Sequence, residues 1–254
     1  MNKTIGFFGD SFCSEVRNHH SMWYGYTTYM KQLADHYDAT VVNVGHGGSS
    51  IWDTLLLQLN PFIQNNNVPD ICVFVWTVPG RLFNREIRRL NNSDIYGKFF
   101  SPFKQNIVKA AKTFYDYLYD REKENIEYLA VLRYIDQEVL SLLPTTTKIV
   151  HLWTAGETND WSLEGIRPAN TSYVHTWVHG SEIRPSLLSL SVYDNDISIL
   201  STDHRANHLD GEFKNRLLFN WIKLAIDNPN SFWDYTNITD KFYDKLSATH
   251  PLAT

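Results

Sequence analysis

The first part of the chain alternates between short apolar runs and polar loops. Residues 4–9, 39–44 and 70–77 are apolar runs too short for a helix and rich in β-branched or aromatic side chains. The first two are followed by a loop and then by apolar residues at helical spacing, over residues 21–37 and 51–63. Strand–loop–helix units in series predict an α/β domain whose parallel sheet is covered by helices on both faces.

The middle of the chain carries a long helical pattern. Between Pro102 and Pro144 there is neither glycine nor proline, and apolar residues recur at every third or fourth position. We predict two packed helices hinged near residues 120–125, with one very long helix as the alternative.

The last part of the chain is less regular. Residues 148–154 and 198–201 are candidates for a fourth and a fifth strand, and residues 211–226 predict a final helix with Asp210 as its N-cap. The stretch 155–191 between the two strands has weak periodicity and scattered glycine and proline. A loop of that length in a compact domain is usually functional, or it contains elements that the pattern does not reveal.

The composition is that of an ordinary globular domain. With 254 residues, 43% of them apolar, residues 1–254 form one domain with its own core. Charged residues make up 20% and the net charge is -5, which argues against disorder, a strongly basic nucleic-acid binder and attraction to anionic membranes. No stretch has membrane-spanning length, the N-terminus resembles a strand rather than a signal peptide, and the two cysteines give no disulfide framework. We therefore expect a cytoplasmic protein, or one packaged in a virion if it comes from a phage. The sequence does not indicate its oligomeric state.

Residues able to carry chemistry follow the predicted strands. Ser11, in the run Gly9-Asp10-Ser11, comes directly after the first strand. The glycine-rich turn 43–50 follows the second, and its backbone N–H groups suit an oxyanion or a phosphate. The block from Asp203 to His208, before the final helix, supplies an imidazole with a nearby carboxylate. A hydroxyl nucleophile needs a base, a group that orients the base, and donors aimed at the oxyanion, and these blocks contain all of them.

Motifs for other chemistry are missing. The turn at Gly45–Gly48 lacks the lysine of a P-loop, and the six-residue dinucleotide fingerprint does not occur. His175 and His179 are four residues apart but have no evident third ligand. We expect no cofactor and no metal.

The order of these blocks resembles the SGNH, or GDSL-type, esterase and lipase family. That family has Gly-Asp-Ser after its first strand, an Asn-x-Gly-x-x-Gly-x-Ser turn after its second, and an Asp/His block before its final helix. The resemblance spans residues 4–226; it is strong for the first two blocks and partial elsewhere. It implies a three-layer α/β/α, flavodoxin-like SGNH hydrolase fold with a parallel sheet of about five strands.

The resemblance also implies a role for each candidate residue. Ser11 would attack an ester carbonyl, and His208 would take its proton and later return it to the leaving alcohol. Asp203 would orient the imidazole of His208. The backbone N–H groups of Ser11 and Gly48 would form part of the oxyanion hole.

Two positions depart from the family pattern. The third block of the family supplies an Asn side chain to the oxyanion hole, but here Thr77 and Arg81 stand in that region and are the candidate donors. Arg81 is also a candidate for holding an acidic group of the substrate, or for a surface charge. The family Asp lies three residues before its His, whereas Asp203 lies five residues before His208. A Ser–His dyad with a carbonyl in the orienting role, or His204 as the base, is therefore an alternative.

The predicted function is a serine esterase that removes a small acyl group, acetyl above all, from a carbohydrate. The alternatives are an O-acyltransferase of the same fold and a catalytically inactive glycan-binding module. Most of the 8 Trp, 14 Tyr and 14 Phe are expected in the core, with Trp161, Trp177 and His179 as a candidate sugar platform. The expected partner is a small-molecule or glycan ester, with no nucleic acid and no membrane. A signal-free member with long paired helices is similar to those carried by tailed phages.

Overall fold

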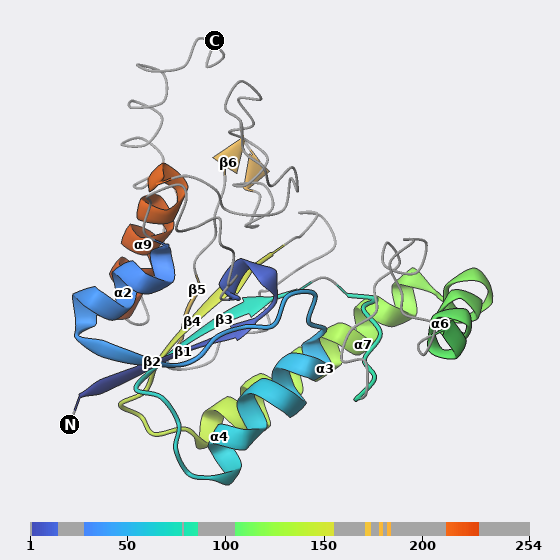
Figure 1. The fold of residues 1–254 in the computed structure, drawn as a ribbon, viewed down its shortest axis with the longest axis horizontal. Helices are drawn as coiled ribbons and strands as arrows, with labels where there is room; N and C mark the ends of the chain where they lie inside the picture. The colour runs from blue at the N-terminus through green and yellow to red at the C-terminus, as the bar shows by residue number, and fades with distance from the viewer. Residues whose placement is uncertain are drawn as a thin grey trace.

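The core of the protein is a parallel β-sheet with helices on both faces (Figure 1). The computed structural model describes residues 2–14, 28–77, 79–85, 105–154, 171–173, 178–179, 182–183 and 212–228. The sheet contains β1 (Lys3–Gly9), β2 (Ala39–Asn43), β3 (Ile71–Trp76), β4 (Lys148–Trp153) and β5 (Thr171–Tyr173). Their order is β2-β1-β3-β4-β5, and each neighbouring pair is parallel. A short antiparallel pair, β6 (Val178–His179) and β7 (Glu182–Ile183), is separate from this sheet. The predicted α/β class with a parallel sheet is confirmed.

Central strands are apolar along their whole length because both of their faces are covered. All six residues of β3 are buried, as are the last five of β1. On β1 the side chains alternate, so Phe7 packs in the core on one face of the sheet and Phe8 in the core on the other. Burying one such ring contributes roughly 1.5–3 kcal/mol to stability. The edge strand β2 is exposed at its three central residues.

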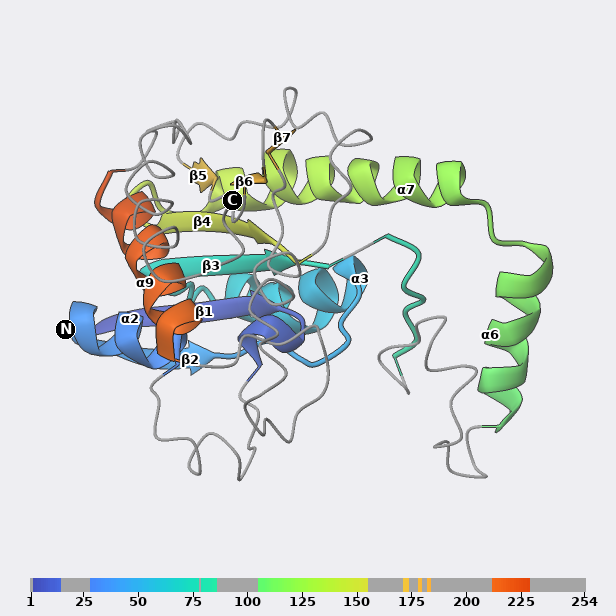
Figure 2. The same cartoon turned by 90° about the horizontal axis from the view of Figure 1, so that it is seen from above.

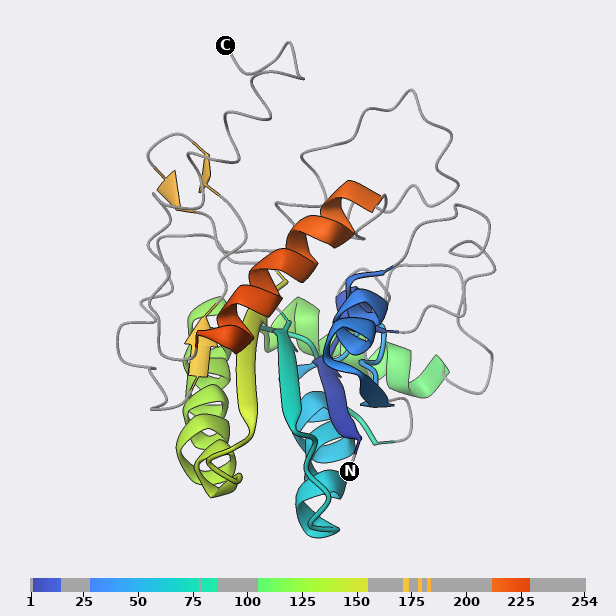
Figure 3. The ribbon, with the colours of Figure 1, turned by 90° about the vertical axis from the view of Figure 1, so that its left-hand side faces the viewer.

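The helices form two layers. They are α2 (Tyr29–Tyr37), α3 (Ile51–Asp53), α4 (Asn60–Gln64), α6 (Gln105–Tyr117), α7 (Arg121–Tyr134) and α9 (Glu212–Asp227). Helices α2 and α9 pack against each other on one face of the sheet (Figure 3). Helices α3, α4 and α7 cover the other face, and α6 stands at the far end of α7, away from the sheet (Figure 2). None of the helices described here is long and apolar enough to cross a membrane.

The helical predictions are confirmed in outline and corrected in detail. The chain breaks between α6 and α7, where Asp120 Oδ1 caps α7 by accepting the Lys123 N–H at 2.8 Å, so two helices are present rather than one. The expected packing of the two helices is not found, because α6 turns away from α7 at this break. Within the helix expected over residues 21–37, α2 begins at Tyr29 with Thr28 as its N-cap, and residues 21–27 lie outside the described residues. Between α3 and α4 the chain winds as a π-helix over Thr54–Leu59.

Two strand predictions have different outcomes. The fourth strand is found as β4. The proposed fifth strand, residues 198–201, lies outside the described residues. Instead β5 extends the sheet from within the stretch 155–191, where the sequence pattern indicated no strand.

Candidate functional site

Ser11 lies in a tight turn at the carboxyl end of β1. Residues Ser11–Cys13 form one turn of 3-10 helix, capped by Asp10, whose Oδ1 accepts the Phe12 N–H at 3.1 Å. Phe12 and Cys13 are buried, whereas Ser11 is half-buried. The Ser11 hydroxyl makes no hydrogen bond to any residue that the structure describes.

Gly9 allows this turn to sit close against β3. A Cβ atom at Gly9 would lie 2.1 Å from the Val75 carbonyl oxygen, and its φ of +147° is a conformation that other residues rarely adopt. Each residue of the Gly-Asp-Ser run therefore has a physical task. Gly9 permits the close approach to β3, Asp10 caps the turn, and Ser11 is left partly exposed.

The glycine-rich turn after β2 is bonded directly to the Ser11 turn. The Gly45 N–H donates to the Cys13 carbonyl at 2.8 Å, and the His46 N–H donates to the Gly9 carbonyl at 2.9 Å. Gly48, in the same turn, has a φ of +78°, in the left-handed region. These bonds fix the segment that contains Gly48 against the segment that contains Ser11.

A network of buried polar side chains forms hydrogen bonds with both turns. Gln58 Oε1 accepts the Gly9 N–H at 2.8 Å, while its Nε2 donates to the Gly9 carbonyl at 2.9 Å. The same Nε2 donates to Asp53 Oδ1 at 3.0 Å and to Ser49 Oγ at 3.1 Å. Gln58 lies in the π-helical stretch, a distortion of the helix that often occurs at functional sites. The sequence analysis did not identify Gln58, because it falls within an ordinary helical pattern.

The network also contains a histidine–carboxylate pair. His46 Nδ1 lies 3.0 Å from Oδ1 of Asp53, whose side chain is fully buried, while the imidazole is 33% exposed. Burial raises the pKa of Asp53, but hydrogen bonds from His46 and Gln58 outweigh it and hold that pKa below its usual value. Asp53 is therefore an ionised carboxylate that orients the imidazole of His46. This pair was also missed, since the two residues match no motif.

The loop after β3 carries Thr77 and Arg81. Arg81 Nη1 donates to the Ser49 carbonyl at 3.0 Å and lies 3.4 Å from Asp10 Oδ2, so its side chain points toward the Ser11 turn. Thr77 is buried, and its hydroxyl makes no hydrogen bond of standard geometry with the described residues, although it lies close enough to Asp10 to lower the pKa of that carboxyl. The Thr77 carbonyl accepts the hydroxyl of Tyr128, from α7, at 2.7 Å.

The carboxyl of Asp10 is buried, and Arg81 is the one cation that pairs with it among the described residues. Burial raises the pKa of its carboxyl above the usual value, and the Arg81 guanidinium and the Phe12 N–H oppose that rise. Removal of Arg81 would leave this carboxyl without its only nearby positive charge among the described residues.

The structure thus brings together Ser11, Gly48, Thr77 and Arg81, from the loops at the carboxyl ends of β1, β2 and β3. The expected base His208 and its partner Asp203 lie outside the described residues, as do His204, Trp161 and Trp177. In the described part of the chain, no three His, Cys, Asp or Glu residues are grouped so that they could hold a metal ion.

Comparison with protein-family models found no match to this chain, and comparison with curated proteins also found none. Its function therefore has to be inferred from the residues of the site and their geometry.

Proposed function

We propose that the protein is a serine ester hydrolase of the SGNH type with Ser11 as its nucleophile. The observation that carries this proposal is the position of Ser11: it is half-buried, its hydroxyl bonds to none of the residues that the structure describes, and its turn is bonded to the glycine-rich turn of Gly48. A serine in such a place is accessible to a substrate while its backbone is held rigidly.

The strand order supports the same conclusion. In an open parallel sheet, ligands bind outside the carboxyl ends of the strands, where the connections leave in opposite directions. In the order β2-β1-β3-β4-β5 this switch point lies between β1 and β3. Ser11 follows β1, and Thr77 and Arg81 follow β3, so the candidate residues flank this switch point. The same order is that of flavodoxin-like folds, and we propose the three-layer SGNH fold for this chain.

In the proposed mechanism, Ser11 Oγ attacks the ester carbonyl and its proton passes to His208. The backbone N–H groups of Ser11 and Gly48 stabilise the oxyanion of the tetrahedral intermediate. Collapse of the intermediate leaves the acyl group on Ser11, and His208 returns the proton to the departing alcohol. Water then attacks the acyl-enzyme, giving the free acid and restoring Ser11.

Arg81 is the better candidate for the third oxyanion donor. The hydroxyl of Thr77 is buried and faces Asp10. Arg81 uses Nη1 for Asp10 and Ser49, whereas Nε and Nη2 bond to no residue in the described ranges. Those N–H groups are able to donate to a developing negative charge.

Replacement of the nucleophile tests the proposal. We expect Ser11→Ala to lower kcat for p-nitrophenyl acetate by about a thousandfold or more, and to abolish labelling by a fluorophosphonate. Ser141→Ala, at an exposed serine that precedes the amino end of β4, is the control and should keep activity within about threefold. Hydrolysis that survives in Ser11→Ala would exclude Ser11 as the nucleophile.

The same assay separates the alternative activities. An O-acyltransferase would release p-nitrophenol faster when an acceptor alcohol is added, and would form the transferred ester. A binding module would release none and would resist labelling at Ser11.

A further inference from the structure

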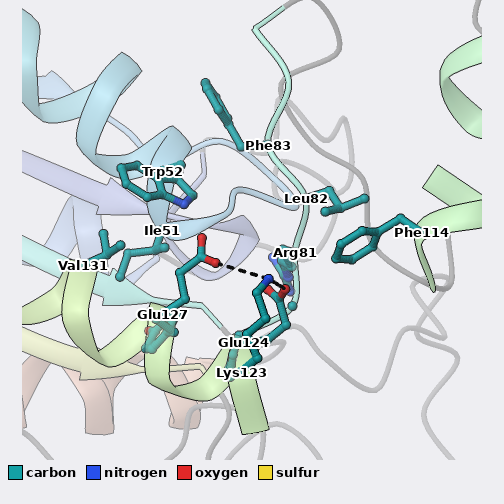
Figure 4. Close-up of a pocket in the computed structure, with 13 residues that line it drawn as sticks. Ile51, Trp52, Arg81, Leu82, Phe83, Phe114, Lys123, Glu124, Glu127 and Val131 are labelled. Atoms are coloured by element: carbon teal, nitrogen blue, oxygen red, sulfur yellow. Dashed lines mark hydrogen bonds and ion pairs between the residues drawn. The ribbon is translucent and has the colours of Figure 1, made fainter. Parts of the chain in front are cut away.

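A cavity of about 480 Å³ lies where α3, α6, α7 and the loop after β3 come together (Figure 4). Its volume is within the usual range for small-ligand pockets, roughly 300–1,000 Å³. No residue of the Ser11 turn or of the glycine-rich turn 43–50 is among the described residues that line it. Of its side chains, the proposed esterase mechanism uses only Arg81. The cavity is therefore a candidate binding site separate from the Ser11 turn.

The charged side chains of this cavity leave a net negative charge. Arg81 Nη1 is paired with the buried Asp10 side chain at 3.4 Å, so its positive charge is matched outside the cavity. Among the described lining residues this leaves Lys123 against Glu124 and Glu127. One ammonium group facing two carboxylates disfavours an anionic ligand and favours a ligand with a positive charge.

Lys123 pairs only weakly with the two carboxylates. Its Nζ lies 3.5 Å from Glu124 Oε1 and 3.9 Å from Glu127 Oε2, both longer than the roughly 2.7–2.9 Å of a strong charged hydrogen bond. Its side chain is 63% exposed, so its ammonium can move into water at little cost. The side chain of Glu124 is only 13% exposed, so its carboxylate depends on a partner within the cavity. A cationic ligand can therefore take the place of Lys123.

Aromatic rings surround these charged groups. Figure 4 shows the side chains of Trp52, from α3, Phe83, from the loop after β3, and Phe114, from α6, around the charged side chains of α7. All three residues are half-buried, so part of each ring remains available to a ligand. The face of an aromatic ring attracts a cation. Ile51 and Val131 add an apolar wall that suits the alkyl part of such a ligand.

The two carboxylates and the rings together select the kind of cation. A quaternary ammonium has no N–H group, so it would leave the nearly buried Glu124 without hydrogen bonds, which is costly. A guanidinium is flat, carries several N–H donors and stacks on aromatic rings. It can donate to Glu124 and Glu127 at once while a face of it lies against a ring. A metal ion needs more oxygen ligands than these two carboxylates, and the described residues contain no group of three possible metal ligands.

We propose that this cavity binds an alkylguanidinium group, held between the carboxylates of Glu124 and Glu127 and against the ring of Trp52. The group belongs to a free small molecule or to an arginine side chain of a peptide, which present the same chemistry. This binding activity goes beyond the proposed hydrolysis and does not depend on it, because no ester takes part.

Calorimetric titration of the whole protein with matched ligands tests the proposal. Butylguanidinium and butylurea have the same shape but only the first carries a charge, and tetramethylammonium carries a charge without an N–H group. We expect butylguanidinium to bind at least about tenfold more tightly than either, and its binding to weaken as salt is added. Equal binding of butylurea, tighter binding of tetramethylammonium, or no binding at millimolar concentrations would overturn the proposal.

Variants of the cavity locate the site. We expect Glu124→Gln to weaken the binding of butylguanidinium by about tenfold or more and Trp52→Ala by about threefold or more. Lys123→Met should strengthen it by about threefold, because the competing ammonium is removed, and mere loss of structure would not do this. Glu122→Gln and Tyr117→Ala, exposed changes outside the cavity, are the controls and should stay within about twofold. Unchanged binding in both Glu124→Gln and Trp52→Ala would place the ligand elsewhere and overturn the proposal.

Two further ligands distinguish the sources of the guanidinium. Agmatine represents a free small molecule, and acetyl-Gly-Arg-Gly-amide represents an arginine in a peptide. Tighter binding of either one supports the proposal and identifies its source, whereas failure of both to compete with butylguanidinium would contradict it. Thermal unfolding of each variant identifies misfolding, and the comparison of ligands uses the unaltered protein, so it tests the proposal even if a variant does not fold.

Discussion

At the residue scale, the buried side chain of Gln58 holds the backbone directly before the Ser11 turn. Its amide pairs with both the N–H and the carbonyl of Gly9 and also donates to Asp53. Because Gln58 is buried, the groups that it bonds would have no water to replace its hydrogen bonds if it were removed.

We expect Gln58→Leu to lower the free energy of unfolding by about 1–3 kcal/mol, since it leaves the buried Gly9 N–H without its acceptor and removes one donor each from the Gly9 carbonyl and from Asp53. Urea unfolding followed by fluorescence measures this change. Gln64→Leu, an exposed change in the neighbouring helix α4, serves as the control and should shift stability by less than about 0.5 kcal/mol. A similar, small effect of both variants would show that the network does not stabilise the turn.

The Gly9-Asp10-Ser11 run could be predicted from the sequence, but the contacts that support it could not. Ser11 was singled out because the Gly-Asp-Ser run, the glycine-rich turn 43–50 and the block 203–208 follow one another in the order of a known family pattern. His46 and Asp53 are seven positions apart, and only the folded turn brings them together. Arg81 was left with several roles because its long side chain can reach in many directions, and the direction is set by Asp10 and Ser49.

At the scale of elements, α6 and α7 are separate helices because the chain turns sharply between them. The two helices differ in direction, and α6 stands away from the sheet (Figure 2). Tyr115, from α6, donates its hydroxyl to the Gly80 carbonyl, so α6 also holds the loop of Arg81.

Loss of the α7 cap should weaken this arrangement. We expect Asp120→Ala to lower the free energy of unfolding by about 1 kcal/mol, because it leaves the Lys123 N–H without its side-chain acceptor. Glu138→Ala, an exposed change beyond the end of α7, should have a smaller effect. Chemical denaturation of the two variants compares them, and equal stabilities would argue against a role for the cap.

The length of each element decided whether it could be predicted. The strands β1 and β3 were recognised because burial on both faces makes them continuous apolar runs. Three-residue β5 is too short to carry a pattern, and its pairing with β4 depends on contacts distant in sequence. The π-helical turn was also invisible, because it preserves the apolar spacing of an ordinary helix while shifting Gln58 beneath Gly9.

For the whole molecule, one buried histidine links stability to pH. Trp76 Nε1 donates to His151 Nδ1 at 2.8 Å, which requires that nitrogen to be unprotonated. Burial lowers the pKa of His151 to about 3 in the folded protein, from a usual value of 6.5. As pH falls below 6.5, the unfolded chain therefore binds a proton that the folded protein does not, and unfolding is favoured.

We expect this residue to cost about 1.4 kcal/mol of stability for each pH unit between its unfolded and folded pKa values. His151→Gln keeps a hydrogen-bond acceptor for Trp76 but does not titrate, so its unfolding free energy should fall less steeply from pH 6.5 to pH 4. Urea titrations at several pH values measure the two slopes. Parallel slopes would show that His151 is not the group responsible.

The hydrogen bonds around Gly9 have a consequence for how the site behaves over time. Gly9 belongs to β1, an interior strand of the sheet, and its N–H and carbonyl bond to buried Gln58, while the glycine-rich turn bonds to the carbonyls of Gly9 and Cys13. The Ser11 turn therefore cannot open by itself, because its opening requires the interior of the sheet to open as well. The turn therefore opens together with the interior of the sheet, so a ligand would meet a site that is already assembled.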